Sequence, residues 1–127
     1  MTAYTHFEPT SIFAAGDDFI KRKVTVLTGQ NASGAVLPRG TLLGKVTATG
    51  KYKVSVTGAS DGSQNPRAIL ADDIDTSAAD VVCAVYEEGE FVFEVCNIDS
   101  SWTIDTLNGI MSDTSRDLYF RSCGATP

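Results

Sequence analysis

Several features that define broad classes of protein are missing from this sequence. No apolar run approaches the roughly 20 residues needed to span a bilayer, and residues 1–6 have neither the basic nor the apolar region of a signal peptide. Only ten Lys and Arg accompany sixteen Asp and Glu, and the net charge of -6 repels phosphate backbones and anionic membranes. We therefore expect a protein that folds in a cytoplasm and has neither nucleic acid nor a membrane as its partner.

Histidine and cysteine are scarce, which limits catalysis and metal binding. The single histidine, His6, lies near the start of the chain, so no Ser-His or Cys-His pair can form within a rigid core. Cys83, Cys96 and Cys123 are odd in number and widely spaced, unlike a disulfide framework or a zinc site. We interpret them as thiols, two of them as small buried residues of strands. The sequence thus predicts a protein that is not an enzyme and has no cofactor.

Three short segments resemble ligand sites but lack essential parts of them. Residues 40–46 have three residues between their glycines, where a phosphate loop needs four, and Val46 stands where a hydroxyl must bind magnesium. The aspartates of residues 72–75 lack the glycine and distal glutamate of a calcium loop. The glutamates of residues 87–90 fall at a predicted hairpin tip, open to water. We interpret both acidic groups as solvated turns.

The remaining pattern predicts one mainly β domain. A chain of 127 residues with 43% hydrophobic content is sized for a single core. Short runs of β-branched and aromatic residues alternate with polar residues, and Gly, Asp and Asn separate them. The predicted strands start at Lys23 and continue at residues 41–47, 51–56, 67–71, 81–86, 90–95 and 118–121.

Three of these predictions are specific enough to test. In residues 51–56 we expect Tyr52, Val54 and Val56 on one face and the alternate residues on the other. Residues 87–89 contain a glycine and should form the turn of a hairpin between the strands 81–86 and 90–95. The apolar spacing of residues 104–111 predicts a short helix, and Ser100, Ser101 or Thr103 could cap its start.

Residues 1–22 differ from the domain that follows at 23–127. Their apolar side chains follow neither the strand nor the helix period, and Pro9 and Gly16 disfavour a helix. Apolar residues on an irregular terminal segment need another surface to cover them. We interpret the segment as an extended arm, with a terminus folded back on its own domain as the alternative. The candidate binding residues of the arm are Tyr4, Phe7, Ile12, Phe13 and Phe19.

Four ordered segments carry a resemblance to a known family. They are Gly29-Gln-Asn31, Leu37 to Tyr52 with its run LPRGTLLGKVTATGKY, Asp61 to Thr76 with its run DGSQNPRAILADDIDT, and Val85 to Phe91 with its run VYEEGEF. In this order and spacing they resemble the lambda-type bacteriophage head decoration proteins. The resemblance covers nearly the whole chain; the cysteines and residues 121–127 depart from it.

The resemblance implies a structure and a function. The fold would be a β-clip-like small barrel with one short C-terminal helix and an extended N-terminal arm. The protein would form a homotrimer at threefold positions on the outer surface of the expanded head. Its partner there would be the major capsid protein, and it would stabilise the virion against the pressure of packaged DNA without catalysis. It would be made in the host cytoplasm.

The arm suggests how such a protein attaches. About 20 residues reach on the order of 65 Å when extended, enough to lie across a neighbouring coat subunit. We expect the arm to add as a strand to the edge of a coat-protein sheet, so that backbone hydrogen bonds supply affinity. Tyr4, Phe7, Ile12 and Phe13 would then fill pockets and set the register.

Two other functions remain open from the residues alone. A carbohydrate-binding or host-attachment module would use Trp102, Tyr52 or Tyr86 as platforms for stacking sugars. An enzyme of the same broad architecture would need a site, and fold analogy does not supply one.

Overall fold

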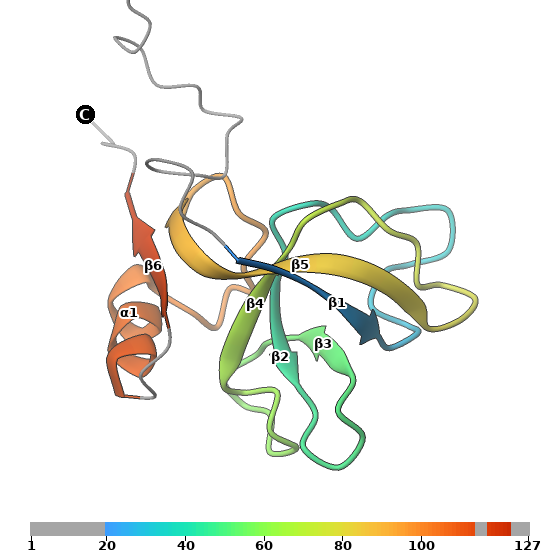
Figure 1. Cartoon of the computed structure of the whole chain (residues 1–127), viewed down its shortest axis with the longest axis horizontal. Helices are drawn as coiled ribbons and strands as arrows, with labels where there is room; N and C mark the ends of the chain where they lie inside the picture. The colour runs from blue at the N-terminus through green and yellow to red at the C-terminus, as the bar shows by residue number, and fades with distance from the viewer. Residues whose placement is uncertain (1–19, 114–116, 123–127) are drawn as a thin grey trace, which may run out of the picture.

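Six strands and one helix form within residues 20–113 and 117–122, which are the residues that the computed structural model describes. A small barrel lies on one side, and the helix and last strand lie beside it (Figure 1). The elements are β1 Ile20–Val26, β2 Leu42–Lys45, β3 Tyr52–Val54, β4 Pro66–Leu70, β5 Val81–Val92, α1 Ile104–Asp113 and β6 Asp117–Arg121.

Five of the strands close into the barrel. Their order is β1-β3-β2-β4-β5, and an antiparallel ladder between β1 and β5 closes the ring. β6 extends the sheet by pairing in parallel with the second half of β5, from Glu88↔Asp117 to Val92↔Arg121. The predicted fold class, a mainly β domain with a small barrel and one short helix, is confirmed.

Two apolar clusters form on the two sides of the barrel wall. Neighbouring residues of β2 and β4 point in opposite directions, so Leu42 and Ile69 belong to one cluster while Leu43 and Leu70 belong to the other. Because both faces are covered, these strands read as continuous apolar runs, and the buried strand predicted at residues 67–71 is confirmed. The inner cluster contains Val26, Leu37, Leu43, Tyr52, Ala68, Leu70, Cys83 and Val85. The outer cluster joins the wall to α1 and β6 and includes Phe91, Trp102, Leu107, Met111, Leu118 and Phe120.

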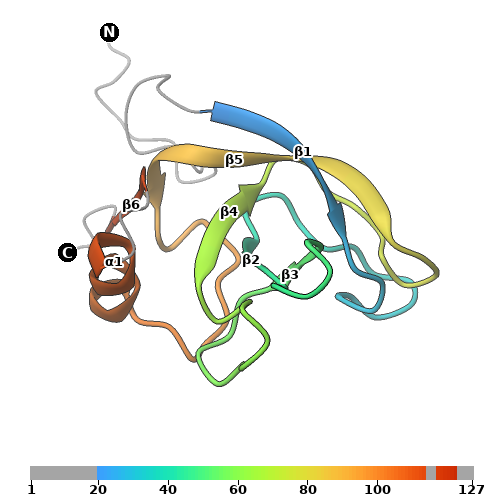
Figure 2. The same ribbon diagram turned by 60° about the horizontal axis from the view of Figure 1, so that its bottom comes forward.

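The predicted hairpin around residues 87–89 is wrong. β5 is a single strand from Val81 to Val92, and it crosses from the barrel to β6 (Figure 2). The neighbouring strand β4 pairs with it at Tyr86 and Val85. Its longer ladders are with strands distant in sequence: β1 pairs with it as far as Glu88, and β6 pairs with it from Glu88 onward. Gly89 has φ +144° and stays in the strand, opposite Leu118. The glycine therefore serves a strand conformation that other residues rarely adopt, not a turn.

The strand predicted at residues 51–56 is shorter than expected. β3 ends at Val54, and Ser55 is fully buried although the alternation placed it on the polar face. Its backbone N–H donates to the carbonyl of Leu42 at 3.1 Å, and its hydroxyl donates to the carbonyl of Ser63 at 2.7 Å. These bonds satisfy the buried polar groups, which a period of two cannot reveal.

The helix and the last strand agree with their predictions. α1 begins after Thr103, whose hydroxyl accepts the backbone N–H of Thr106 at 3.2 Å, while the hydroxyl of Thr106 accepts the N–H of Thr103 at 3.0 Å. This reciprocal capping fixes the start of the helix. In β6, Leu118 and Phe120 are buried and Tyr119 is exposed, as the alternation predicts. β1 begins at Ile20, earlier than the expected Lys23.

Candidate functional site

The five candidate arm residues Tyr4, Phe7, Ile12, Phe13 and Phe19 lie outside the described residues. The structure does describe the strand from which the arm would extend. β1 pairs with β5 along its whole length, from Ile20↔Glu88 to Val26↔Val81, with a shift of register after Ile20. Residue 20 is therefore attached to the barrel wall, and the segment before it starts from a fixed point.

A polar cluster lies beside the start of β1. Arg22 donates from Nε to Oε1 of Glu87 at 2.7 Å, and the hydroxyl of Tyr52 lies 3.5 Å from Oε2 of the same carboxylate. The pKa of Tyr52 is raised, first by burial and then by the negative charge of Glu87, while Arg67 and Arg22 oppose the rise. Tyr52 belongs to the inner cluster, so this group of charges adjoins the apolar interior of the barrel.

The acidic residues 87–90 do not form the open hairpin tip that the sequence suggested. They lie along β5, where Glu87 pairs with Arg22 and Glu90 pairs with Arg121 at 3.2 Å. Each carboxylate thus joins β5 to a different neighbouring strand. Surface pairs of this kind contribute about 0–1 kcal/mol each, so their main effect is on register and charge.

The aspartates of residues 72–75 organise turns, as predicted. Asp73 accepts the backbone N–H of Arg39 at 2.6 Å. Asp75 accepts the N–H of Ser77 and the side-chain amide of Asn31, and these bonds lower its pKa to about 2. No group of three or more His, Cys, Asp or Glu side chains in the described ranges is arranged to hold a metal ion.

The aromatic residues proposed as sugar platforms are buried. Tyr52 is 4% exposed, Tyr86 6% and Trp102 6%. The indole N–H of Trp102 donates to the carbonyl of Ser55 at 3.1 Å, inside the outer cluster. A sugar ring needs an open aromatic face on which to stack, and none of the three offers one. The carbohydrate-binding interpretation therefore loses the residues on which it depended.

One residue that sequence reasoning missed protects the edge of the sheet. β6 is the last strand in the strand order, so one of its edges has no strand beside it among the described residues. Asn108 of α1 donates from Nδ2 to the carbonyl of Phe120 at 2.9 Å and accepts the N–H of Phe120 at 3.0 Å. Its amide takes the place of a strand partner and blocks added pairing at that point. No local pattern marks it, since an Asn in a helix is ordinarily a surface residue.

Comparison with known proteins identifies the family. A family model described as bacteriophage lambda head decoration protein D matches residues 8–108. The chain belongs to the bacteriophage lambda head decoration protein D family. The four segments that carried the resemblance all lie inside the matched range. Curated proteins were also compared, and none of them matches the chain.

Membership of the head decoration family gives the chain its general role. The family is one of structural capsid proteins and not of enzymes, so this chain is a phage capsid decoration protein associated with the virion. The match starts at residue 8 and includes Ile12, Phe13 and Phe19 of the predicted arm. The helix α1, which is the one helix in the described residues, is not long and apolar enough to cross a membrane.

The thiols of this decoration protein are structural where they are described. Cys83 and Cys96 are free, and burial raises their pKa values to about 11 and about 12. Thiols held in the protonated form are poor nucleophiles and metal ligands. Cys83 is buried in β5, as predicted, whereas Cys96 is only partly buried and follows the end of that strand. Cys123 lies outside the described residues.

Proposed function

We propose that the chain binds the outer surface of the expanded phage head as a homotrimer at threefold positions. There it contacts the major capsid protein and stabilises the head against the pressure of packaged DNA. The observation that carries the proposal is the match to the head decoration family over residues 8–108. The net charge of -6 supports a protein partner, because it disfavours nucleic acid and anionic membranes. Synthesis in the host cytoplasm would precede attachment.

The arm is the proposed means of attachment. The 19 residues before Ile20 can reach on the order of 65 Å when extended. In the proposal they add as a strand to a coat-protein sheet edge, and Tyr4, Phe7, Ile12, Phe13 and Phe19 occupy pockets on the coat. The ladder between β1 and β5 supports this, because it fixes the point on the barrel wall from which the arm would extend.

Three arms on one trimer would make the attachment avid. Ordering a single arm costs conformational entropy, so one copy should bind weakly. Once the first arm binds, the other two act at a high effective concentration, and the trimer as a whole dissociates slowly. A ligand that binds only the assembled, expanded shell shifts the equilibrium away from rupture by mass action. Stabilisation of the head follows from this preference.

Deletion of residues 2–18 tests the arm directly. The truncated protein should keep the far-UV spectrum and unfolding transition of the full chain, because the deletion ends before β1. It should fail to sediment with expanded heads, and it should not raise the temperature at which heads release their DNA. The full chain should sediment with the heads and should raise the temperature at which they release their DNA. Tight binding by the truncated protein would show that the attachment lies elsewhere on the domain.

A further inference from the structure

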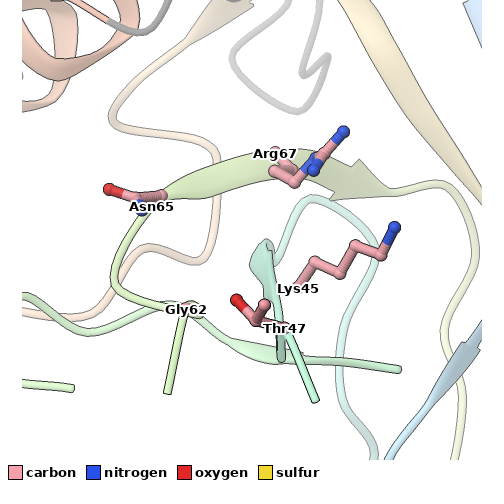
Figure 3. A pocket seen from close by; sticks show the side chains of 5 residues that line it. All are labelled: Lys45, Thr47, Gly62, Asn65 and Arg67. Carbon is pink, nitrogen blue, oxygen red and sulfur yellow. The ribbon is translucent and has the colours of Figure 1, made fainter. Parts of the chain in front are cut away.

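A hollow of about 190 Å³ lies between the ends of β2 and β4 and the loop that joins β3 to β4, residues 55–65. Among the described residues, its lining contains no carboxylate and no apolar side chain. Lys45 and Arg67 extend from adjacent strands in the same direction (Figure 3). The hollow is lined by Lys45, Thr47, Gly62, Asn65 and Arg67.

The two cations of the hollow are not neutralised. Neither Lys45 nor Arg67 forms an ion pair with a carboxylate among residues 20–113 and 117–122, whereas Arg22, Lys51 and Lys53 each do. The carboxylate of Asp61, next to Gly62, is already engaged by Ser63 and by Lys53 at 3.3 Å. Lys23 and Arg39 also form no ion pair within the described residues, so what distinguishes Lys45 and Arg67 is that both line one hollow.

The shape of the hollow is fixed by close backbone packing. Gly62 has φ +106°, and a Cβ at this position would collide with the Thr47 hydroxyl and approach the Lys45 carbonyl to 2.9 Å. The N–H of Thr47 donates to the carbonyl of Asp61 at 2.9 Å, and Ser55 holds the carbonyl of Ser63. These contacts hold the loop against β2 before any ligand arrives, which reduces the entropy lost on binding.

The donors of the hollow suit a single carboxylate. The planar guanidinium of Arg67 can donate two parallel hydrogen bonds to a carboxylate, and the Lys45 ammonium adds a point charge. Thr47 and Asn65 also line the hollow, but their polar groups point to the opposite side from the ends of Lys45 and Arg67 (Figure 3), so the two cations are the groups that would hold the carboxylate. A polyphosphate backbone would experience repulsion from the rest of this acidic molecule, whereas an Asp or Glu side chain on a protein brings one negative charge to the cavity.

The hollow is connected to the start of β1 through the side chain of Tyr52, whose backbone pairs with Val26 at the far end of that strand. Lys45 is the register partner of Tyr52, and the Tyr52 hydroxyl contacts the same Glu87 that Arg22 binds. Arg67 also acts electrostatically on Tyr52. Among the described residues, the cations of the hollow and the start of β1 are thus linked only through this side chain, so the coat surface that the pocket meets is separate from the attachment point of the arm.

We propose that the hollow between Lys45 and Arg67 is a carboxylate-binding pocket that receives an acidic side chain of the major capsid protein. The identity of the partner rests on the proposed function, whereas the ability to bind a carboxylate does not. Arm and pocket then have separate roles: the arm supplies most of the affinity, and the pocket selects the orientation of the domain on the coat.

Binding of a simple carboxylate tests the pocket without heads. Acetate is titrated at constant ionic strength, with chloride as balance, while the backbone amide signals of Thr47, Gly62 and Asn65 are followed by NMR. These signals should shift saturably in the wild type. They should shift equally in the control Lys23→Gln/Arg121→Gln and not in Lys45→Gln/Arg67→Gln, which has the same net charge. Absence of a saturable shift, or a response to phosphate but not to acetate, would overturn the assignment.

Binding to expanded heads tests the partner. At about 0.15 M salt, Lys45→Gln/Arg67→Gln should bind about tenfold more weakly than the wild type and depend less on salt, while the control should remain within about twofold. If the wild type binds heads and the pocket variant binds equally well, the pocket proposal is wrong and the decoration role stands. If the wild type does not bind heads, the decoration role fails, and the acetate titration still decides whether the pocket exists.

Discussion

Small residues determine how closely the loop of residues 55–65 approaches β2. A Cβ at Gly44 would collide with the backbone carbonyl of Ser63, so only glycine permits this approach. Ser55 is small enough to be buried there, and it satisfies the same carbonyl with its hydroxyl. At the residue scale, the stability of this end of the barrel thus depends on backbone contacts more than on large apolar side chains.

Alanine at two glycines should have opposite effects. Gly44→Ala should lower the free energy of unfolding by about 1–3 kcal/mol, because the new methyl group displaces the Ser63 backbone. Gly109→Ala is the matched control: it lies in α1 with nothing within 4 Å of the added Cβ and should raise the free energy of unfolding by about 0.5–1 kcal/mol. Urea denaturation measures both. If Gly44→Ala is as stable as the wild type, the loop does not pack on β2 as described.

Two hydrogen-bonded aspartates should make the fold sensitive to acid. Ser63 and Lys53 lower the pKa of Asp61 to about 2, and Ser77 and Asn31 lower that of Asp75 to about 2. Because both pKa values lie below the unfolded value of about 3.9, their contribution is present above about pH 4 and is lost as the pH falls towards 2. The free energy of unfolding of Asp61→Asn/Asp75→Asn should depend less on pH in that window. An unchanged slope in urea denaturation at pH 2–5 would contradict this.

At the scale of the elements, patterns of residues close in sequence were sufficient to predict some helices and strands but not others. The start of α1 at Thr103 and the alternation of β6 could be predicted, because capping and burial there depend on residues close in sequence. The continuity of β5 through residues 87–89 could not be predicted, because the strands that pair with it there, β1 and β6, lie about sixty residues before it and about thirty after it. Ser55 was assigned to the wrong face because its partners come from three separate segments.

In the candidate site, too, some features could be predicted from the sequence and others depend on distant residues. The arm could be proposed from composition, since its apolar residues follow no period. The proximity of Lys45 and Arg67 could not be predicted from the sequence, because it depends on the register between β2 and β4, which shifts after Leu43. Asn108 was missed for a related reason: its partner, Phe120, lies on a strand whose position is set by β5.

Removal of the Asn108 amide should destabilise the pairing of α1 with β6. Asn108→Ala leaves the N–H and carbonyl of Phe120 without their side-chain partners, at a cost of about 1–3 kcal/mol in the free energy of unfolding. Ser112→Ala, an exposed substitution in the same helix, should cost nothing measurable. Thermal or urea unfolding of the two variants gives the comparison. Equal stability of both variants would show that the amide contributes little to holding the edge.

At the scale of the whole molecule, a rigid barrel provides the base for two different contacts. The wall is packed on both faces, so the strands that hold the start of the arm and the cations of the pocket have fixed positions. Membership of the head decoration family connects this base with a capsid. In our account, a weak arm becomes an avid attachment because a trimer presents three copies to a shell that repeats the same site.

Co-sedimentation with expanded, undecorated heads of the phage that encodes the protein tests the central claim most directly. Purified protein is added over a range of concentrations, and the bound copies are counted against coat subunits in the pellet. The account predicts saturable binding at about one copy per coat subunit, as trimers at threefold positions require. Absence of binding to intact expanded heads would contradict the proposed attachment, and saturation far below this ratio would contradict the trimer at every threefold position.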